Sequence, residues 1–285
     1  MNWSTTFSLL SSVLALGSSF LHAVELKAES AKAFDQYIRA YEDKMHAEVT
    51  LGEFLSVDQK AQSISSRAYE RLKAGEVLIE QRNSDKHLPN ALLHHWIATA
   101  FFPGASVDQV FAILKDYRDY PTIYGPEVVT ARVLAQRGDE FKVSLRLRKH
   151  KILTVLLDTD YDVRFTRSDA AHGYSRSYST RIVEIEHPGE ATEHELPVGE
   201  DHGFLWRLYT YWRFVEQDGG VYAQCEAISL TRDVPSGLGW LVGGFVESIP
   251  RESLVFTLNS TRKALAAPQV NVAGAGKDQN AKKWR

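Results

Sequence analysis

The chain has 285 residues, 44% of them hydrophobic and 24% charged, which is the composition of a globular protein with one substantial core. Its net charge of −3, spread over interspersed acidic and basic residues, offers no basic surface for a phosphate backbone, so nucleic acid is not an expected partner. The one cysteine, Cys225, excludes an intrachain disulfide and a multi-cysteine metal site. Its position within a predicted strand favours a small packed residue over a nucleophile.

An uncharged apolar stretch occupies residues 7–21. It is short for a transmembrane helix and matches the hydrophobic region of a secretory signal peptide, with Ala23 as the expected residue before cleavage. Residues 1–23 are therefore predicted to be a signal peptide that exports the protein to the periplasm or the medium. Residues 1–6 contain no Lys or Arg, which weakens the pattern, and the alternative is an apolar anchor that is not cleaved.

Two amphipathic helices are predicted over residues 27–50 and 57–73. In the first, apolar residues recur at the spacing i, i+3, i+4 and i+7: Phe34, Tyr37, Ile38 and Tyr41. Two short helices do not enclose a core, so this N-terminal helical extension, residues 24–75, is expected to dock on the domain that follows. The alternatives are a surface for a protein partner and a transient contact with a membrane, and the mixed charges of the polar face disfavour the membrane.

Strands are predicted over residues 76–82 and 94–102, and Trp96 lies on an apolar face of the second. The adjacent His94 and His95 point to opposite faces of that strand. The two rings are therefore not expected to chelate one metal ion, and surface or hydrogen-bonded histidines are expected instead.

A short helix capped by Ser106 precedes four predicted strands, at residues 128–135, 140–148, 152–165 and 174–186. Charged residues alternate along the second and third of these strands: Arg146, Arg148, Asp158, Asp160 and Asp162. Cross-strand ion pairs are expected to balance the three carboxylates. The DxDxD spacing is also that of a calcium loop, but Val163 stands where such a loop needs glycine, so no metal is expected.

Residues 203–233 have the pattern of one β-hairpin, with strict alternation of side chains along its first strand. One face is the more apolar and is expected to point inward: Phe204, Trp206, Leu208, Thr210, Trp212 and Phe214. The other face is mixed and is expected to meet water: Arg207, Tyr209, Tyr211 and Arg213. Both a two-residue turn, which places Trp212 opposite Cys225, and a three-residue turn, which places it opposite Glu226, fit residues 218–220.

The returning strand has one face of small residues: Ala223, Cys225, Ala227 and Ser229. Large residues opposite small ones indicate a sheet curved around a hollow. A long helix then begins at Ser248, with Pro250 in its first turn. Its apolar stripe consists of Leu254, Leu258, Thr261 and Leu265. Since the stripe and one face of the sheet both have to be covered, the helix is expected to lie across the sheet. Residues 268–285 lack periodicity and are predicted to be a disordered tail.

In this order of elements the chain resembles the START/Bet v 1-like superfamily, also called the SRPBCC or polyketide cyclase-like fold. The resemblance covers residues 94–265 and rests on the element order, the hairpin and the closing helix. It implies an α+β helix-grip fold over residues 76–267: a curved antiparallel β-sheet wrapped around a long C-terminal helix, with a hydrophobic tunnel between them. Members of the superfamily mostly bind lipids, sterols, quinones, polyketides or plant hormones, and a minority are cyclases or dehydratases.

The expected function is the binding or transport of a hydrophobic small molecule, with no cofactor. The residues predicted to line its cavity are Trp96, Trp206, Leu208, Thr210, Trp212, Leu254 and Leu258. In the plainest alternative the tryptophans fill a solid core.

Two further alternatives remain. An enzyme acting on a lipid or polyketide substrate would need a general acid or base such as Glu226, Asp158 or a histidine. The chain has no nucleophile elbow, HExxH or P-loop motif, so no catalytic residue is assigned. The other alternative is a protein-interaction module built on residues 27–73.

Overall fold

The structure is a computed structural model, and it describes residues 25–82, 86–150, 154–233 and 244–267, with the backbone alone at 244–247. The predicted signal peptide and the predicted disordered tail lie outside the described residues.

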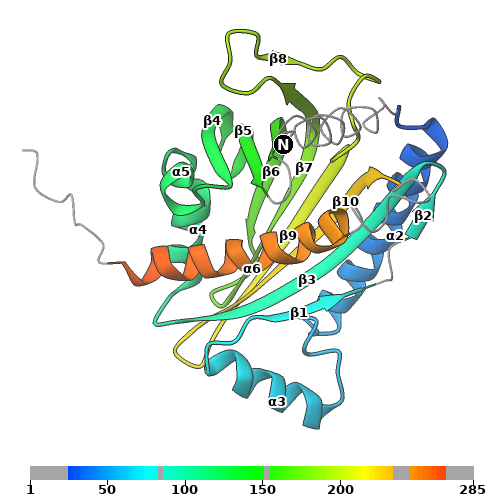
Figure 1. Cartoon of the computed structure of the whole chain (residues 1–285). Helices are drawn as coiled ribbons and strands as arrows, with labels where there is room; N and C mark the ends of the chain where they lie inside the picture. The colour runs from blue at the N-terminus through cyan, green and yellow to red at the C-terminus, as the bar shows by residue number, and fades with distance from the viewer. Residues whose placement is uncertain (1–24, 83–85, 151–153, 234–243, 268–285) are drawn as a thin grey trace, which may run out of the picture.

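One curved antiparallel sheet forms the framework (Figure 1). Its strands follow the order β1-β3-β10-β9-β7-β6-β5-β4, so β3 pairs with the last strand of the chain. Their bounds are Leu78–Gln81 (β1), Ala91–Pro103 (β3), Gly220–Arg232 (β10), Arg207–Gln217 (β9), His172–Glu186 (β7), Thr154–Arg167 (β6), Glu140–His150 (β5) and Val128–Arg137 (β4). Two short strands, β2 (Lys86–Leu88) and β8 (His194–Glu195), pair with β3 and β7.

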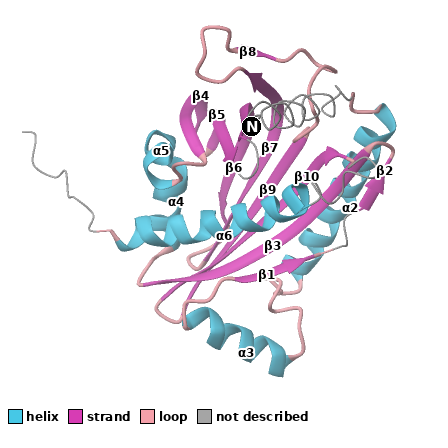
Figure 2. Ribbon diagram, in the orientation of Figure 1, coloured by secondary structure: helices cyan, strands magenta, loops and turns pink. Residues whose placement is uncertain are grey.

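Helices cover both faces of this sheet (Figure 2). On the concave face, α6 (Gly244–Ala266) crosses β3 and β10 and packs against both. On the convex face lie α2 (Ala28–Thr50) and α3 (Gln62–Lys73). Three short helices pack near the C-terminal half of α6: α4 (Val107–Lys115), η1 (Tyr117–Asp119) and α5 (Tyr120–Ile123). This is the α+β helix-grip fold that the element order predicts.

The hairpin of β9 and β10 has the two-residue turn. Trp212 pairs with Cys225, which leaves Asp218 and Gly219 as the turn residues. Their φ angles are 56° and 74°, and a type I′ turn requires positive φ at both positions. This register places Cys225 and the other small residues of β10 on the concave face of the sheet.

The outer face of β9 is largely covered: Arg207 and Tyr209 are half-buried and the rest of the predicted water-facing set is buried, so the expectation is wrong at Tyr211 and Arg213. Tyr211 and Arg213 are 1% and 2% exposed. The helix α2 covers this face, and it packs there through Phe34 and Ile38, as the docking prediction expects. Because this apolar stripe is buried against the sheet, it does not offer a surface to a protein partner.

The closing helix begins earlier than predicted. It starts at Gly244 rather than at Ser248, so Pro250 lies inside the helix and not in its first turn. Proline has no N–H and does not donate the usual helical hydrogen bond at that position. Further along, the predicted apolar stripe is buried against the sheet, as Leu254 and Leu258 show.

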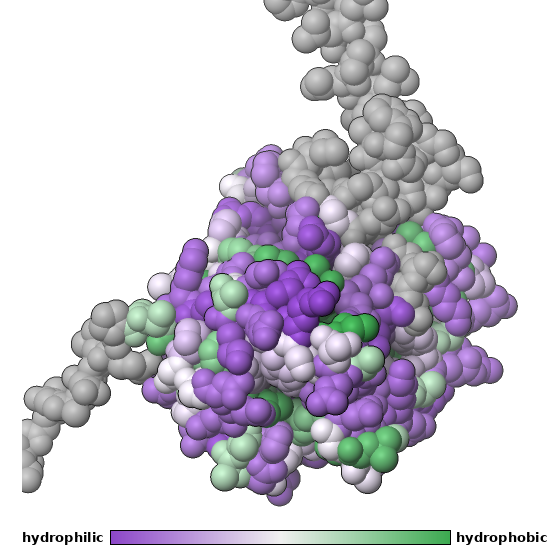
Figure 3. All heavy atoms as spheres, turned by 90° about the horizontal axis from the view of Figure 1, so that it is seen from below, coloured by the Kyte–Doolittle hydropathy of each residue, from purple (hydrophilic) through white to green (hydrophobic). Residues whose placement is uncertain are grey.

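Hydrophobic side chains lie mostly inside. Seen from below, the described surface is largely hydrophilic, and the hydrophobic residues that reach it form small separate patches (Figure 3). The most exposed large hydrophobic residues of the described segments are Leu51, Ile64, Val129, Val133, Leu134 and Val198. Patches of this kind are normal for globular proteins and do not by themselves mark a binding surface. Transient membrane contact therefore stays a prediction.

Candidate functional site

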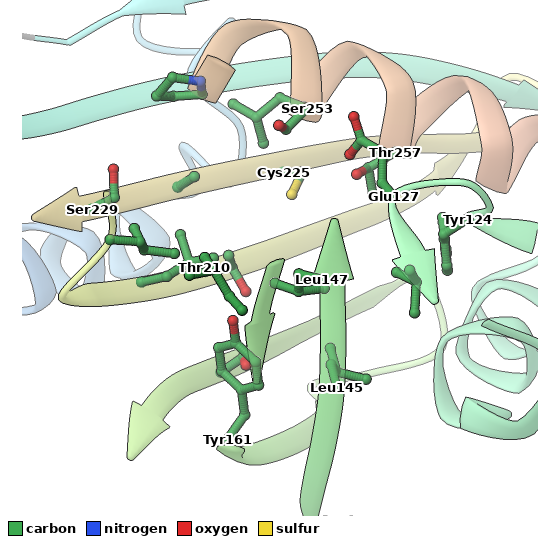
Figure 4. Close-up of a pocket in the computed structure, with 18 of the residues that line it drawn as sticks. Tyr124, Glu127, Leu145, Leu147, Tyr161, Thr210, Cys225, Ser229, Ser253 and Thr257 are labelled. Carbon is green, nitrogen blue, oxygen red and sulfur yellow. The ribbon is translucent and has the colours of Figure 1, made fainter. Parts of the chain in front are cut away.

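A cavity of about 300 Å³ lies between the concave face of the sheet and α6 (Figure 4). Its walls come from β5, β6, β7, β9 and β10, its roof from the first half of α6, and one end from the segment between α4 and β4. Most of the lining is apolar, and the volume is at the small end of the roughly 300–1,000 Å³ that is typical of ligand pockets. The space under α6 is therefore hollow and not a solid core.

The small side chains of β10 leave this space open. Cys225, Ala227 and Ser229 all line the cavity. Across from them on β9, Trp212 pairs with Cys225 and Thr210 pairs with Ala227. Protein interiors are close-packed, so larger side chains at these β10 positions would fill the volume.

Four of the seven predicted residues line the cavity: Leu208, Thr210, Trp212 and Leu254. Leu258 lies one turn further along α6, is fully buried in the core beside the cavity and does not line it. Trp96 packs against the same core from β3, opposite Ala227, and is also outside the lining.

Trp206 faces away from the cavity, so the alternation predicted for its strand does not extend this far. It packs on the convex face with Phe34 of α2, and its indole nitrogen donates to Asp201 Oδ1 at 2.9 Å. The strand β9 begins only at Arg207, and the predicted inward face is regular from Leu208 onward.

The break has a local cause at Gly203. Its φ is +70°, and a Cβ atom there would lie 2.8 Å from the Trp206 ring and 2.7 Å from the Arg232 side chain. Positive φ favours glycine, and the absence of a Cβ atom allows this close approach of the ring to the backbone. The adjacent Phe204 and Leu205 then both line the cavity. A glycine at the start of a predicted strand is the signal that could have indicated the break.

Tyrosines supply part of the polar lining, and the sequence analysis did not predict them. Tyr124 is hydrogen-bonded to Thr261 Oγ1 at 2.9 Å, and Tyr120 donates to the Leu114 carbonyl at 2.7 Å. Tyr161 reaches into the cavity from β6 (Figure 4), and its hydroxyl makes no hydrogen bond of ordinary geometry to a described residue. Burial raises the pKa of all three phenols, that of Tyr161 to about 12, so they are uncharged at neutral pH.

Lys149 and Glu127 are the charged residues among the described lining, and they form an ion pair with each other. The Lys149 ammonium also donates to Ser253 Oγ on α6 at 2.6 Å, so this pair joins β5 to the roof. Burial lowers the pKa of Lys149, and the Glu127 carboxylate opposes that shift. No local sequence signal marks these residues, because the pair forms between segments that meet only in the folded sheet.

The residues named above as possible general acids or bases, namely Glu226, Asp158 and the histidines that the structure describes, do not line the cavity. Glu226 is fully buried on the convex face, where it lies 2.5 Å from His95. Asp158 lies on the outer face of β6, where Arg146 binds both of its oxygens, at 2.7 and 2.8 Å, as the charge pattern predicts. Within the described part of the chain, no histidine lines the cavity.

A second hollow, of about 530 Å³, lies between α3 and β1. Its lining is different in kind, because four cationic side chains contribute to it: Lys60, Arg67, Arg71 and Arg251. An apolar lining with a few polar groups is the common form of a small-molecule site, so the cavity under α6 is the better candidate.

In the segments that the structure describes, no helix combines the length and the apolar composition needed to cross a membrane. In the same segments, no cluster of His, Cys, Asp or Glu side chains has the arrangement of a metal site.

No protein-family model matches the chain, and no curated protein does. Solved structures with a similar arrangement exist at low sequence identity. A STAR-related lipid transfer protein fragment from Xanthomonas axonopodis is 17% identical with a TM-score of 0.44, covering 66% of this chain and 99% of that one. The Zhui aromatase/cyclase from Streptomyces sp. R1128 is 14% identical with a TM-score of 0.45, covering 64% and 98%. Human STARD10 is 12% identical with a TM-score of 0.40, covering 73% and 80%. The order of the strands and the closing helix are those of the helix-grip fold that the element order predicts.

Proposed function

We propose that the protein binds and carries a small hydrophobic molecule in the cavity between the sheet and α6. The observation that carries this proposal is the cavity itself, an apolar hollow of about 300 Å³ that the described side chains leave open. Burial of apolar ligand surface contributes roughly 25 cal/mol per Å², less the cost of association. The apolar stretch at residues 7–21 supports export as part of the same proposal, on its sequence pattern alone.

Carriage rather than catalysis is proposed because of where the acid–base groups lie. A general acid or base has to come within hydrogen-bonding distance of its substrate. Glu226 and Asp158 lie outside the cavity, and the charged groups inside it, Lys149 and Glu127, are bound to each other.

Filling the cavity tests the proposal. The variant Thr210→Trp is expected to weaken binding of the neutral fluorescent probe N-phenyl-1-naphthylamine at least roughly tenfold, because the added indole occupies the space that the ligand needs. Tryptophan is well tolerated in strands, so β9 should keep its pairing. Titration of the purified protein with the probe measures the affinity, and circular dichroism confirms that the variant is folded.

The matched control is Thr130→Trp, which adds the same side chain at an exposed position of β4 outside the cavity. It should bind the probe as the wild type does. Equal loss in both variants, or no loss in either, would contradict the proposal.

A further inference from the structure

Tyr161 presents a buried polar atom that its surroundings do not satisfy. The residue is 5% exposed, lines the cavity and carries a hydroxyl without a hydrogen bond of ordinary geometry to any described residue. Buried polar groups in native proteins are nearly always hydrogen-bonded, and an exception calls for an explanation. Figure 4 shows the phenol of Tyr161 pointing from β6 into the cavity, toward the side where Thr210 lies.

Several of the groups around Tyr161 have partners of their own. Thr159 lies on the same face of β6, where its hydroxyl donates to the Leu145 carbonyl at 2.9 Å; burial raises the pKa of Tyr161, and the proximity of Thr159 partly opposes that rise. Tyr120 and Tyr124 have their own partners, and the two charged lining residues bind each other. Across β5, Tyr161 faces Val143, which is apolar. The lining of the cavity is mostly apolar with a few hydroxyl groups, among them those of Thr210 and Ser177, so it suits a mostly apolar occupant that carries a polar atom.

The required polar atom is a hydrogen-bond acceptor without charge. A neutral phenol donates one hydrogen bond and can also accept, so an acceptor oxygen on the ligand would satisfy its proton. A carboxylate would bring an unpaired charge into an apolar site, which is costly, because the cation of the lining, Lys149, is already bound to Glu127. We infer that the ligand is an apolar molecule bearing an uncharged acceptor oxygen, as in a ketone, ester, ether or alcohol, and that the Tyr161 hydroxyl binds this oxygen. This inference rests on the proposed function and specifies the ligand class.

Three naphthalenes of nearly equal size test it: 2-acetylnaphthalene, 2-ethylnaphthalene and 2-naphthoate. They differ in one group, which is a ketone, a hydrocarbon or a carboxylate. Calorimetric titration of the full chain gives the dissociation constant of each for the wild type and for Tyr161→Phe. The ratio of the ethyl to the acetyl dissociation constant is expected to fall roughly tenfold in the variant, because only the ketone loses a hydrogen bond. This double comparison cancels the difference in hydrophobicity between the two probes.

Two further measurements sharpen the test. Tyr174→Phe removes a hydroxyl outside the cavity and should leave the ratio unchanged. Without ligand, Tyr161→Phe should unfold at the same or a higher urea concentration than the wild type, because the hydroxyl that it removes is unsatisfied.

The outcomes separate the two proposals. If all three naphthalenes bind and the ratio is the same in the wild type and Tyr161→Phe, the inference is wrong and the carrier function stands. Tightest binding of 2-naphthoate would also overturn it, because the acceptor would then be charged. If no naphthalene binds the wild type, the carrier function fails, and the inference fails with it.

Discussion

Replacing Glu226 with alanine is expected to lower the free energy of unfolding by about 3–5 kcal/mol. The carboxylate is fully buried between the sheet and α2, where it accepts from Tyr41, lies 2.5 Å from His95 and pairs with Arg213 at 3.3 Å. Removing it leaves Glu48, at 3.4 Å, as the carboxylate that still neutralises the buried Arg213 guanidinium. When one partner of a buried ion pair is removed, that partner no longer offsets the desolvation cost of the charge that remains, and the folded state is destabilised. Urea denaturation followed by circular dichroism measures the loss.

An exposed ion pair provides the control. Asp162 pairs with Lys142 at 2.6 Å across the outer face of the sheet, and the two side chains are 48% and 62% exposed. Asp162→Ala is expected to cost no more than about 1 kcal/mol, because solvent screens the pair. If Glu226→Ala proved no more destabilising than Asp162→Ala, the buried network would not hold α2 to the sheet as described.

The same carboxylate makes stability depend on pH. Burial raises the pKa of Glu226, but the hydrogen bond from His95 and the charge of Arg213 outweigh burial and hold this pKa below its ordinary value. A lowered folded-state pKa contributes stability that is present above the unfolded-state value, roughly 4.3, and is lost as the pH falls through the folded-state value. Between pH 6 and pH 3, Glu226→Gln should therefore lose stability less steeply than the wild type in urea titrations. An identical slope in both proteins would refute this assignment.

Local patterns predicted the inner face of the hairpin well. Period-two alternation depends only on the geometry of one strand, so it placed Leu208, Thr210 and Trp212 on one face, and the structure has all three lining the cavity. It failed at Trp206, where the backbone leaves the strand pattern at Gly203. An alternation rule carries no information about where the regular strand begins.

The outer face could not be predicted in the same way. Tyr211 and Arg213 look like surface residues in the pattern, and they are buried because a helix from the other end of the sequence covers them. The charge and polarity of the residues along one strand do not indicate which other element of the fold will pack against that strand. The unsatisfied hydroxyl of Tyr161 is missed for the same reason, since the lack of a partner is a property of the whole cavity.

Leu258→Ala is expected to lower the free energy of unfolding by about 3–5 kcal/mol, near the upper end for buried leucines. Leu258 is fully buried where α6 meets the sheet, within the same core as Ala98 and Ala100 of β3. The variant loses the transfer free energy of the side chain and also leaves a void in close-packed surroundings. The midpoint and slope of urea denaturation give the change.

Leu254, one turn earlier on α6, gives the matched comparison. It is 4% exposed but borders the cavity, so one side of its side chain already lacks packing partners. Leu254→Ala should therefore cost less, about 2–3 kcal/mol, and should enlarge the cavity while binding of N-phenyl-1-naphthylamine is retained. Equal costs for the two variants would mean that Leu254 is packed on all sides, and the space beside it would then not be open to a ligand. The difference between the unfolding free energies lost in Leu258→Ala and in Leu254→Ala thus measures, without any ligand, whether the closing helix covers a hollow or a filled core.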